Sequence, residues 1–199
     1  MPEPSSTDLI IGIPTQDQRA IVPRILELGA LGQLLHRRVE FVIGEGSNIP
    51  RSRNAVVEQI QRNHFQSTMW VLWIDSDILV LPGSSPIIAA AMRWAEETHV
   101  CVVGNYRMQT GQSVLMDRRG PEGSPRHYTD AELAALPRPY PEVDLAGLGF
   151  AYCPQPLTYR FHADIIGEDI HFWREHPELR IHLIHDLHLG HRKSKFLFF

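Results

Sequence analysis

The sequence contains only two cysteines, Cys101 and Cys153, among 199 residues. Both lie in apolar runs, so we expect two buried free thiols rather than a disulfide. The four histidines His182, His185, His188 and His191 recur every three residues without a cysteine nearby, which matches no zinc-finger spacing. On a strand this odd spacing alternates between the two faces, so they cannot all bind one metal ion.

The sequence also lacks an apolar run of about 18 residues, the length that a membrane-spanning helix needs. Its first residues, MPEPSSTDL, have no apolar stretch, so we expect no secretory signal and a cytoplasmic protein. The apolar end, KFLFF, follows the basic HRKSK. We expect this tail to fold back onto the core, with peripheral contact to a membrane surface or a partner as the alternative.

There is no excess of basic residues: 19 Lys and Arg stand against 23 Asp and Glu, a net charge of −4. A nucleic-acid-binding face needs basic residues for its phosphate contacts, so the composition argues against nucleic acid as a partner. No internal repeat is evident. The length fits one domain spanning residues 1–199.

Apolar runs alternate with helix-spaced apolar residues along the first half of the chain. This order predicts an α/β fold, with a mostly parallel central sheet and helices on both faces. Pro86 is expected as the first residue of a helix capped by Ser85. The expected strands are 8–15, 38–44, one within 69–83, and 99–106; the expected helices are 18–37, 49–65 and 84–98.

Residues 111–145 are rich in Gly, Pro, Arg and Asp, and we expect a long loop region there. A short helix inside it begins with a capping box formed by Thr129 and Glu132. Beyond this region we expect a glycine-rich turn into a strand at 145–154, a helix at 167–176 and a last strand within 179–191.

Two carboxylates interrupt the most apolar stretch, MWVLWIDSDILVLPG. If the strand continues through them, Asp75 and Asp77 lie on the same side of it, with Ser76 opposite. Paired carboxylates repel unless a cation lies beside them, and two oxygen ligands with open positions suit Mg²⁺ or Mn²⁺. The alternative is that the strand ends at Trp73 and the two aspartates are turn residues.

Several segments resemble, in order and spacing, the landmarks of nucleotide-sugar glycosyltransferases with the GT-A fold, especially family 2 and mannan-polymerase-like enzymes. The similarity covers roughly residues 8–191, but not 111–145. It implies a Rossmann-like domain with a nucleotide-sugar-binding half, 8–106, and an acceptor-side half, 107–199. The segments are IIGIPT, RSRNAVVEQI, VLWIDSDILVLPG, VVGNY, LAGLGFAYCP, GEDIHFWRE and LHLGH.

The resemblance also implies roles for the acidic residues and for one histidine. Asp75 contacts the donor ribose or the metal ion, and Asp77 binds the ion, Mn²⁺ or Mg²⁺. His191, in LGH, is a further metal ligand, with His188 as the second choice. Asp169, in GED, is the general base that deprotonates the acceptor hydroxyl, and Glu168 is an acceptor ligand or the alternative base. Without the resemblance, acids in a first helical turn are expected for helix stability alone.

The remaining implied residues bind the donor. Pro14 and Thr15 end the first strand, where the family holds the base, and Arg53 begins the second helix with Asn54. Arg53 is expected to contact donor phosphate or nucleotide, or else to be a solvated residue at a helix start. Tyr106 lines the sugar pocket or belongs to the core. The glycines Gly147 and Gly149 let the backbone approach the ligand.

These expectations describe a metal-dependent glycosyltransferase that moves a sugar from a nucleotide-sugar donor to a hydroxyl acceptor, with inversion at the anomeric carbon. The acceptor would be a glycan, a lipid-linked sugar or a protein. Two other classes stay open: a nucleotidyltransferase of similar sheet plan, and a non-catalytic nucleotide- or carbohydrate-binding module. GIPTQDQRA lacks the glycine-rich basic loop typical of the former, and the unpaired acids argue against the latter.

Overall fold

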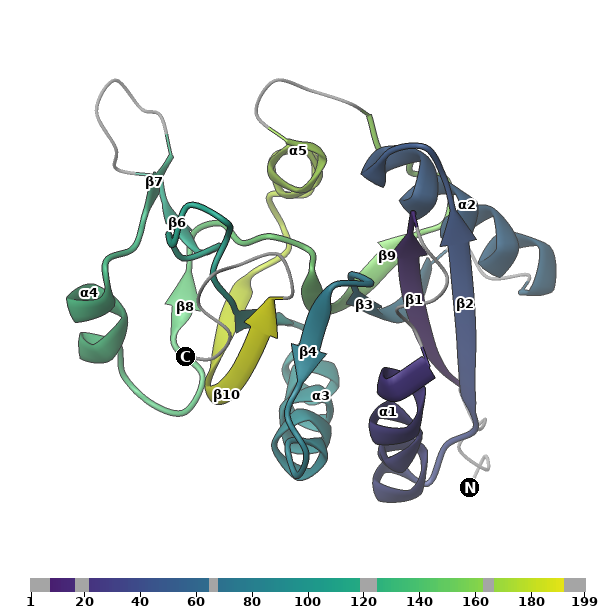
Figure 1. The fold of residues 1–199 in the computed structure, drawn as a ribbon, viewed down its shortest axis with the longest axis horizontal. Helices are drawn as coiled ribbons and strands as arrows, with labels where there is room; N and C mark the ends of the chain where they lie inside the picture. Colours follow the sequence, from purple (N-terminus) through teal and green to yellow (C-terminus); the bar gives the residue numbers. More distant parts are fainter. Residues whose placement is uncertain (1–7, 17–21, 65–67, 119–124, 163–166, 192–199) are drawn as a thin grey trace.

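The computed structural model describes residues 8–16, 22–64, 68–118, 125–162 and 167–191 (Figure 1). The expectations for the N-terminal residues and for the KFLFF tail therefore lie outside the described residues. Strands and helices alternate in the first half as expected, except that the single strand predicted within 69–83 is two strands separated by a turn. The elements of this half are β1 (Leu9–Thr15), α1 (Val22–Leu35), β2 (Val39–Glu45), α2 (Ile49–Asn63), β3 (Thr68–Ile74), β4 (Ile78–Val80), α3 (Ser85–Thr98) and β5 (Cys101–Asn105).

The second half has more regular structure than the sequence predicts for 111–145. Besides the predicted helix, the described residues of this region form three two-residue strands, and such short strands leave no periodic pattern in a sequence. The elements are β6 (Met116–Asp117), β7 (Arg126–His127), α4 (Asp130–Ala135), β8 (Glu142–Val143), β9 (Phe150–Pro156), α5 (Glu168–Glu175) and β10 (Ile181–His191).

Within the described residues, eight strands form one sheet in the order β2-β1-β3-β9-β5-β10-β4, and β8 also pairs with β10. Strands β1, β2 and β3 run parallel, and so do β5 and β10. Strand β9 runs antiparallel between β3 and β5, and β4 and β8 run antiparallel to β10. The sheet is therefore mixed. Strand β9 enters it from the opposite end, and the apolar pattern of the β9 sequence does not indicate this direction.

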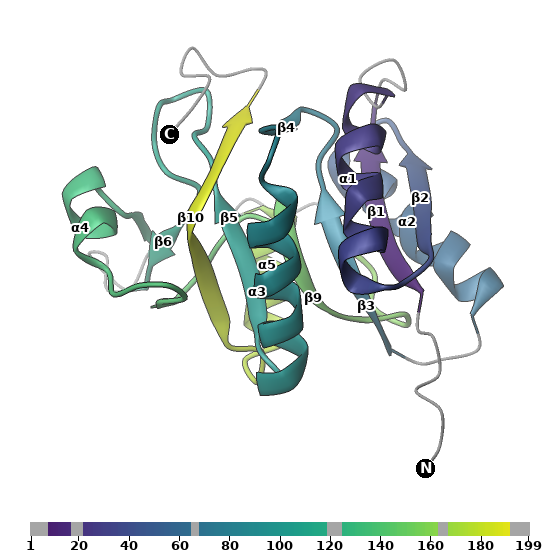
Figure 2. The same cartoon turned by 90° about the horizontal axis from the view of Figure 1, so that it is seen from below.

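Helices cover both faces of this sheet, which confirms the predicted α/β class. Helices α1 and α3 lie on one face and α2 and α5 on the other, as the two orientations in Figures 1 and 2 agree. The central strands are buried on both sides; every residue of β1 is buried, for example. A continuous apolar run is typical of a strand in that position.

Local capping signals explain several boundaries. Asn48 caps α2: its Oδ1 accepts a hydrogen bond from the Arg51 N–H at 3.0 Å. The predicted capping box of Thr129 and Glu132 is present at α4. The predicted cap of α3 is wrong by one residue, because Ser84 is the N-cap and Ser85 is already helical.

Cys101 and Cys153 are free and buried, as predicted. The described helices include none that is both long and apolar enough to cross a membrane.

Candidate active site

A cavity of about 740 Å³ opens where β1 and β3 end and α5 begins. In open α/β sheets, ligands bind in the crevice at the carboxyl ends of the strands. Four carboxylates line the cavity, and Arg53 and His191 are its basic residues among those described. The four acids are the ones that the sequence singles out: Asp75, Asp77, Glu168 and Asp169.

The first two acids belong to a turn, so the expectation of a continuing strand with both aspartates on one side is wrong. The alternative, in which they are turn residues, is confirmed, although the strand ends at Ile74 rather than at Trp73. Strand β3 ends at Ile74, and the Ile78 N–H donates a hydrogen bond to the Asp75 carbonyl at 3.0 Å, which closes the turn. The Asp75 N–H donates to the Gly149 carbonyl at 2.9 Å. The turn nevertheless presents Asp75, Ser76 and Asp77 to the same cavity.

His191 lies beside Asp77 although 114 residues separate them. The antiparallel pairing of β10 with β4 places His191 opposite Ile78, directly after the turn. Its Nε2 lies 3.2 Å from Asp77 Oδ2, and its Nδ1 lies 2.9 Å from the Arg107 carbonyl. A carbonyl oxygen only accepts, so Nδ1 carries a proton and donates it there.

The other histidines of the strand lie away from this cavity. His188 is exposed, so the alternative assignment of the ligand to it gains no support. His182 is buried, with Nδ1 2.9 Å from the Tyr140 carbonyl, and His185 Nε2 lies 3.3 Å from the Leu133 carbonyl. The strand thus separates these side chains, as the odd spacing predicts.

Arg53 lies beneath the acids and is only 1% exposed. Its Nη2 is 3.0 Å from Asp75 Oδ1, and its Nε is 3.4 Å from Glu168 Oε1. Burial alone would lower the pKa of Arg53, but Asp75 and Glu168 raise it above its ordinary value. The pKa of Asp75 is also raised, chiefly by burial, although Arg53 opposes that shift. The alternative of a solvated Arg53 is therefore wrong.

Glu168 and Asp169 are the first two residues of α5. Gly167 precedes them with φ of 92°, a left-handed conformation that favours glycine. The Asp169 carboxylate is half-buried, and Oδ1 accepts a hydrogen bond from the Ile170 N–H at 2.9 Å. Burial, with the nearby charge of Glu168, raises the pKa of Asp169 to about 6. A carboxylate with this pKa suits proton transfer near neutral pH.

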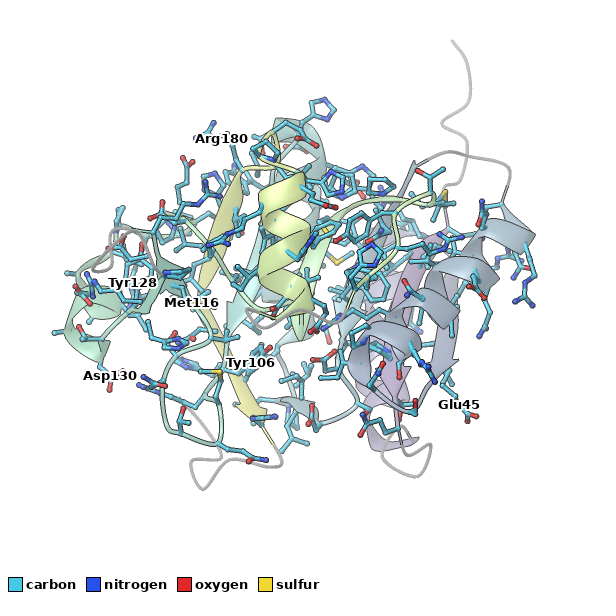
Figure 3. All side chains as sticks on the ribbon, turned by 90° about the horizontal axis from the view of Figure 1, so that it is seen from above. Glu45, Tyr106, Met116, Tyr128, Asp130 and Arg180 are labelled. Atoms are coloured by element: carbon cyan, nitrogen blue, oxygen red, sulfur yellow. The ribbon has the colours of Figure 1, made fainter. Side chains whose placement is uncertain are left out.

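Tyr106 forms part of the cavity wall beside β10, where Figure 3 labels it. Its ring lies 5.7 Å from that of His191, and its Oη accepts a hydrogen bond from the Gly149 N–H at 3.2 Å. A Cβ on Gly147 would lie 2.8 Å from this oxygen, and one on Gly149 only 2.2 Å away. Both glycines therefore make room for Tyr106.

Pro14 and Thr15 line the cavity at the end of β1, as expected for donor-binding residues. The Thr15 carbonyl accepts a hydrogen bond from Ser52 Oγ at 3.2 Å, which fixes the strand end against α2. Sequence reasoning missed several residues of the wall. Gln16, directly after β1, and Ser76, in the turn after β3, follow from the rule that ligands bind at strand ends, whereas the others depend on packing. The missed residues are Gln16, Ile49, Ser52, Ser76, Met108, Gln109 and Val114.

The donor set fits a divalent cation in part. Asp77 and His191 meet at 3.2 Å, and the Nδ1–H bond of His191 directs Nε2 toward Asp77, as in many metal-binding histidines. Asp75 is instead paired with Arg53. In the described part of the chain, no cluster of three His, Cys, Asp or Glu side chains is arranged to hold a metal. Oxygen atoms of a substrate would have to complete the coordination.

Fold and site together define an α/β protein with an acidic cleft at the ends of its central strands. No protein-family model and no curated protein sequence matches the chain. Among solved structures, it is similar to the crystal structure of A197 from STIV, with a TM-score of 0.59 and 16% sequence identity. The match covers 92% of this chain and 85% of that chain. At this identity the likeness concerns the fold alone.

Proposed function

We propose that the protein is a metal-dependent, inverting glycosyltransferase of the GT-A type, which transfers a sugar from a nucleotide-sugar donor to a hydroxyl acceptor. One observation carries this proposal. A single cavity unites the Asp77–His191 pair, at the end of the central strands, with Asp169, whose pKa of about 6 suits a general base.

The charge of the cavity supports a divalent cation, Mn²⁺ or Mg²⁺. Its described lining carries four carboxylates. The guanidinium of Arg53 is buried against two of them, those of Asp75 and Glu168. An anionic diphosphate would be repelled unless a cation accompanied it. Asp77 and His191 would hold that cation, with Asp75 nearby, and it would offset the negative charge that develops on the departing nucleoside diphosphate.

The acids of α5 supply the acceptor chemistry. Asp169 would accept the proton of the acceptor hydroxyl as that oxygen attacks the anomeric carbon and the diphosphate leaves from the opposite side. Glu168 would hold the acceptor through a hydrogen bond. Its side chain is 14% exposed, so part of it faces the cavity while Arg53 holds its other part. The acceptor therefore needs a hydroxyl group, which a glycan, a lipid-linked sugar or a protein can each supply.

The donor would lie along the ends of β1 and β3. Pro14 and Thr15 would contact its base, and Asp75 its ribose. Tyr106, with Gly147 and Gly149 behind it, would border the sugar.

A panel of nucleotide sugars with Mn²⁺ tests the proposal, with released nucleoside diphosphate as the readout. We expect release from one donor, dependent on the metal and lost in Asp77→Ala, while Glu58→Ala, at an exposed acid outside the cavity lining, retains it. A nucleotidyltransferase would instead release pyrophosphate from a nucleoside triphosphate and a sugar phosphate. A binding module would bind a donor without releasing a product.

A further inference from the structure

We propose that Arg53 is a positioning residue that clamps Asp75 to Glu168, and that it does not bind the phosphates of the donor. This assignment replaces the role that the sequence suggests for Arg53. Its consequence for the rate rests on the proposed function, whereas the clamp itself does not.

Each of the three guanidinium nitrogens has a partner within the protein. Two of its nitrogens face carboxylates: Nη2 lies 3.0 Å from Asp75 Oδ1, and Nε lies 3.4 Å from Glu168 Oε1. The third nitrogen, Nη1, donates to the Leu148 carbonyl at 3.4 Å. Since the residue is 1% exposed, a ligand in the cavity meets the two carboxylates before it meets the guanidinium.

Aromatic rings hold the guanidinium from its sides. Its central carbon lies 5.6 Å from the centre of the Trp73 ring and 5.8 Å from that of Phe161. The neighbouring Asn54 fixes Phe161, because its Nδ2 donates to the Phe161 carbonyl at 2.9 Å and its Oδ1 accepts from the Phe161 N–H at 2.7 Å. Arg53 and Asn54 thus act together, one on the acids and the other on the ring beside the clamp.

The clamp joins parts of the site that are distant in sequence. Asp75 follows β3 and Glu168 begins α5, while Arg53 comes from α2 on the same face of the sheet as α5. If Arg53 left this position to reach a phosphate, both acids would lose their counter-charge in a buried place. The planar guanidinium group suits this bridging role because its nitrogens can contact two carboxylates at once. A lysine ammonium group does not, because it is a single point charge.

Under the proposed function, Asp75 contacts the donor and Glu168 the acceptor, so the clamp sets the distance between the two substrates. Misplacement of reacting groups by about 1 Å can reduce a rate by about 100-fold. We therefore expect Arg53→Lys to lower kcat by about 10- to 100-fold. Its affinity for UDP or GDP with Mn²⁺ should stay within about threefold, because the donor contacts remain.

A double-mutant cycle tests the clamp without any turnover. The unfolding equilibrium constants of the wild type, Arg53→Met, Glu168→Gln and the double variant are measured by urea denaturation. Because Glu168 is buried against Arg53, we expect Glu168→Gln to destabilise the wild type but to stabilise the Arg53→Met background. The two substitutions should be coupled by a factor of about ten or more in the unfolding equilibrium constant. If Arg53→Met does not fold, Arg53→Gln, which also removes the charge, replaces it in the cycle. Arg51→Met, an exposed arginine on the same helix, is the matched control and should show no coupling.

The outcomes separate the two proposals. Additive effects of the two substitutions would overturn the clamp, even in an active glycosyltransferase. A fall of about 30-fold or more in UDP or GDP affinity in Arg53→Lys, with unchanged affinity for the nucleoside, would also overturn it, because phosphate binding would then be its role. Clear coupling in a protein that turns over no nucleotide sugar would support the clamp and reject the glycosyltransferase.

Discussion

At the scale of single residues, the environment of Asp169 sets its chemistry. The helix N-terminus favours an ionised carboxylate, yet burial and the charge of Glu168 raise the pKa of Asp169 to about 6. The side chain is therefore ionised at neutral pH and still basic enough to accept a proton. An acid in a first helical turn usually stabilises its helix, so a destabilising one indicates a functional role.

Asp169→Asn removes the base and preserves the shape of the side chain. Since a general base contributes about 10² to 10⁴ in rate, we expect transfer to a hydroxyl acceptor to fall by that factor, with donor affinity nearly unchanged. Initial rates and calorimetric donor binding measure this. Glu168→Gln should weaken acceptor affinity more than turnover. If Glu168→Gln loses turnover while Asp169→Asn keeps it, the roles of the two acids are exchanged.

The same substitution should stabilise the fold above pH 6. The pKa of Asp169 rises from an ordinary 3.8 in the unfolded chain to about 6 in the folded protein, so the folded state binds the proton more tightly. The wild type therefore loses stability as the pH rises from about 4 to about 6. Because asparagine cannot ionise, the variant should gain on the order of 1 to 2 kcal/mol at pH 7.5 and nothing below pH 4.

Urea denaturation at several pH values measures this gain. Glu175→Gln on the same helix, an acid that is half exposed, is the control. A gain that is equal at pH 4 and pH 7.5 would show that the effect does not come from ionisation of Asp169.

At the scale of elements, β10 carries His191, the proposed metal ligand, to the cavity. Its antiparallel pairing with β4 brings His191 to the turn that holds Asp77. The Arg107 carbonyl, in the loop after β5, accepts a hydrogen bond from Nδ1 of the same imidazole and so fixes its orientation. An ion pair between Arg107 and Asp130 ties this loop to α4, so the region 111–145 supports the site indirectly.

His191→Ala should therefore weaken Mn²⁺-dependent binding of UDP or GDP, by about 10- to 100-fold for the loss of one ligand. We expect His188→Ala to leave this affinity within about twofold, because His188 is exposed on the same strand. His182→Ala should have little effect on it as well. Titration calorimetry with and without Mn²⁺ measures these affinities. Equal losses in His191→Ala and His182→Ala would make the LGH assignment a coincidence.

The turn before β9 depends on two glycines that admit Tyr106. In Gly149→Ala the new Cβ would lie 2.2 Å from Tyr106 Oη and 3.0 Å from Asp75 Oδ2. We expect a loss of about 1 to 3 kcal/mol in stability from this overpacking, together with weaker donor binding. Thermal unfolding and donor titration measure both effects.

Gly29→Ala is the matched control for that substitution. Gly29 lies within α1, and a Cβ there would meet nothing within 4 Å. Alanine should therefore stabilise this helix by roughly 0.5 to 1 kcal/mol. Gly149→Ala with wild-type stability and donor affinity would contradict the tight packing around Tyr106.

At the scale of the whole molecule, one mixed sheet with helices on both faces places every site residue at the ends of a few strands. Segments from β1, α2, the turn after β3, the loop after β5, α5 and β10 meet there. A ligand that bridges these segments should therefore stabilise the fold as a unit.

We expect GDP or UDP together with Mn²⁺ to raise the melting temperature, and either component alone to raise it far less. At a ligand concentration of about 100 times Kd, the gain of about 2.7 kcal/mol corresponds to roughly 5 to 10 °C for a chain of this size. Scanning calorimetry measures the shift, and EDTA should reverse it. Asp77→Ala should show no shift. An equal shift without metal would contradict a cation-dependent donor site.

The sequence by itself determined most of the longer elements and singled out the acidic residues of the cavity. Apolar periodicity located the main strands and helices, because the buried side chains recur at a different spacing in a strand than in a helix. The acids at 75, 77, 168 and 169 were visible because carboxylates are unusual beside apolar strands.

Only the tertiary structure decided which of these residues meet. The antiparallel entry of β9 and the pairing of β10 with β4 depend on long-range hydrogen bonds, which leave no local pattern in the sequence. They bring His191 to Asp77 and Arg53 to Asp75 and Glu168. An arginine at a helix start looks the same in sequence whether it is solvated or buried. The fold decided between these two states, because it buries Arg53 and brings two carboxylates within about 3.5 Å of the guanidinium, which a buried guanidinium requires.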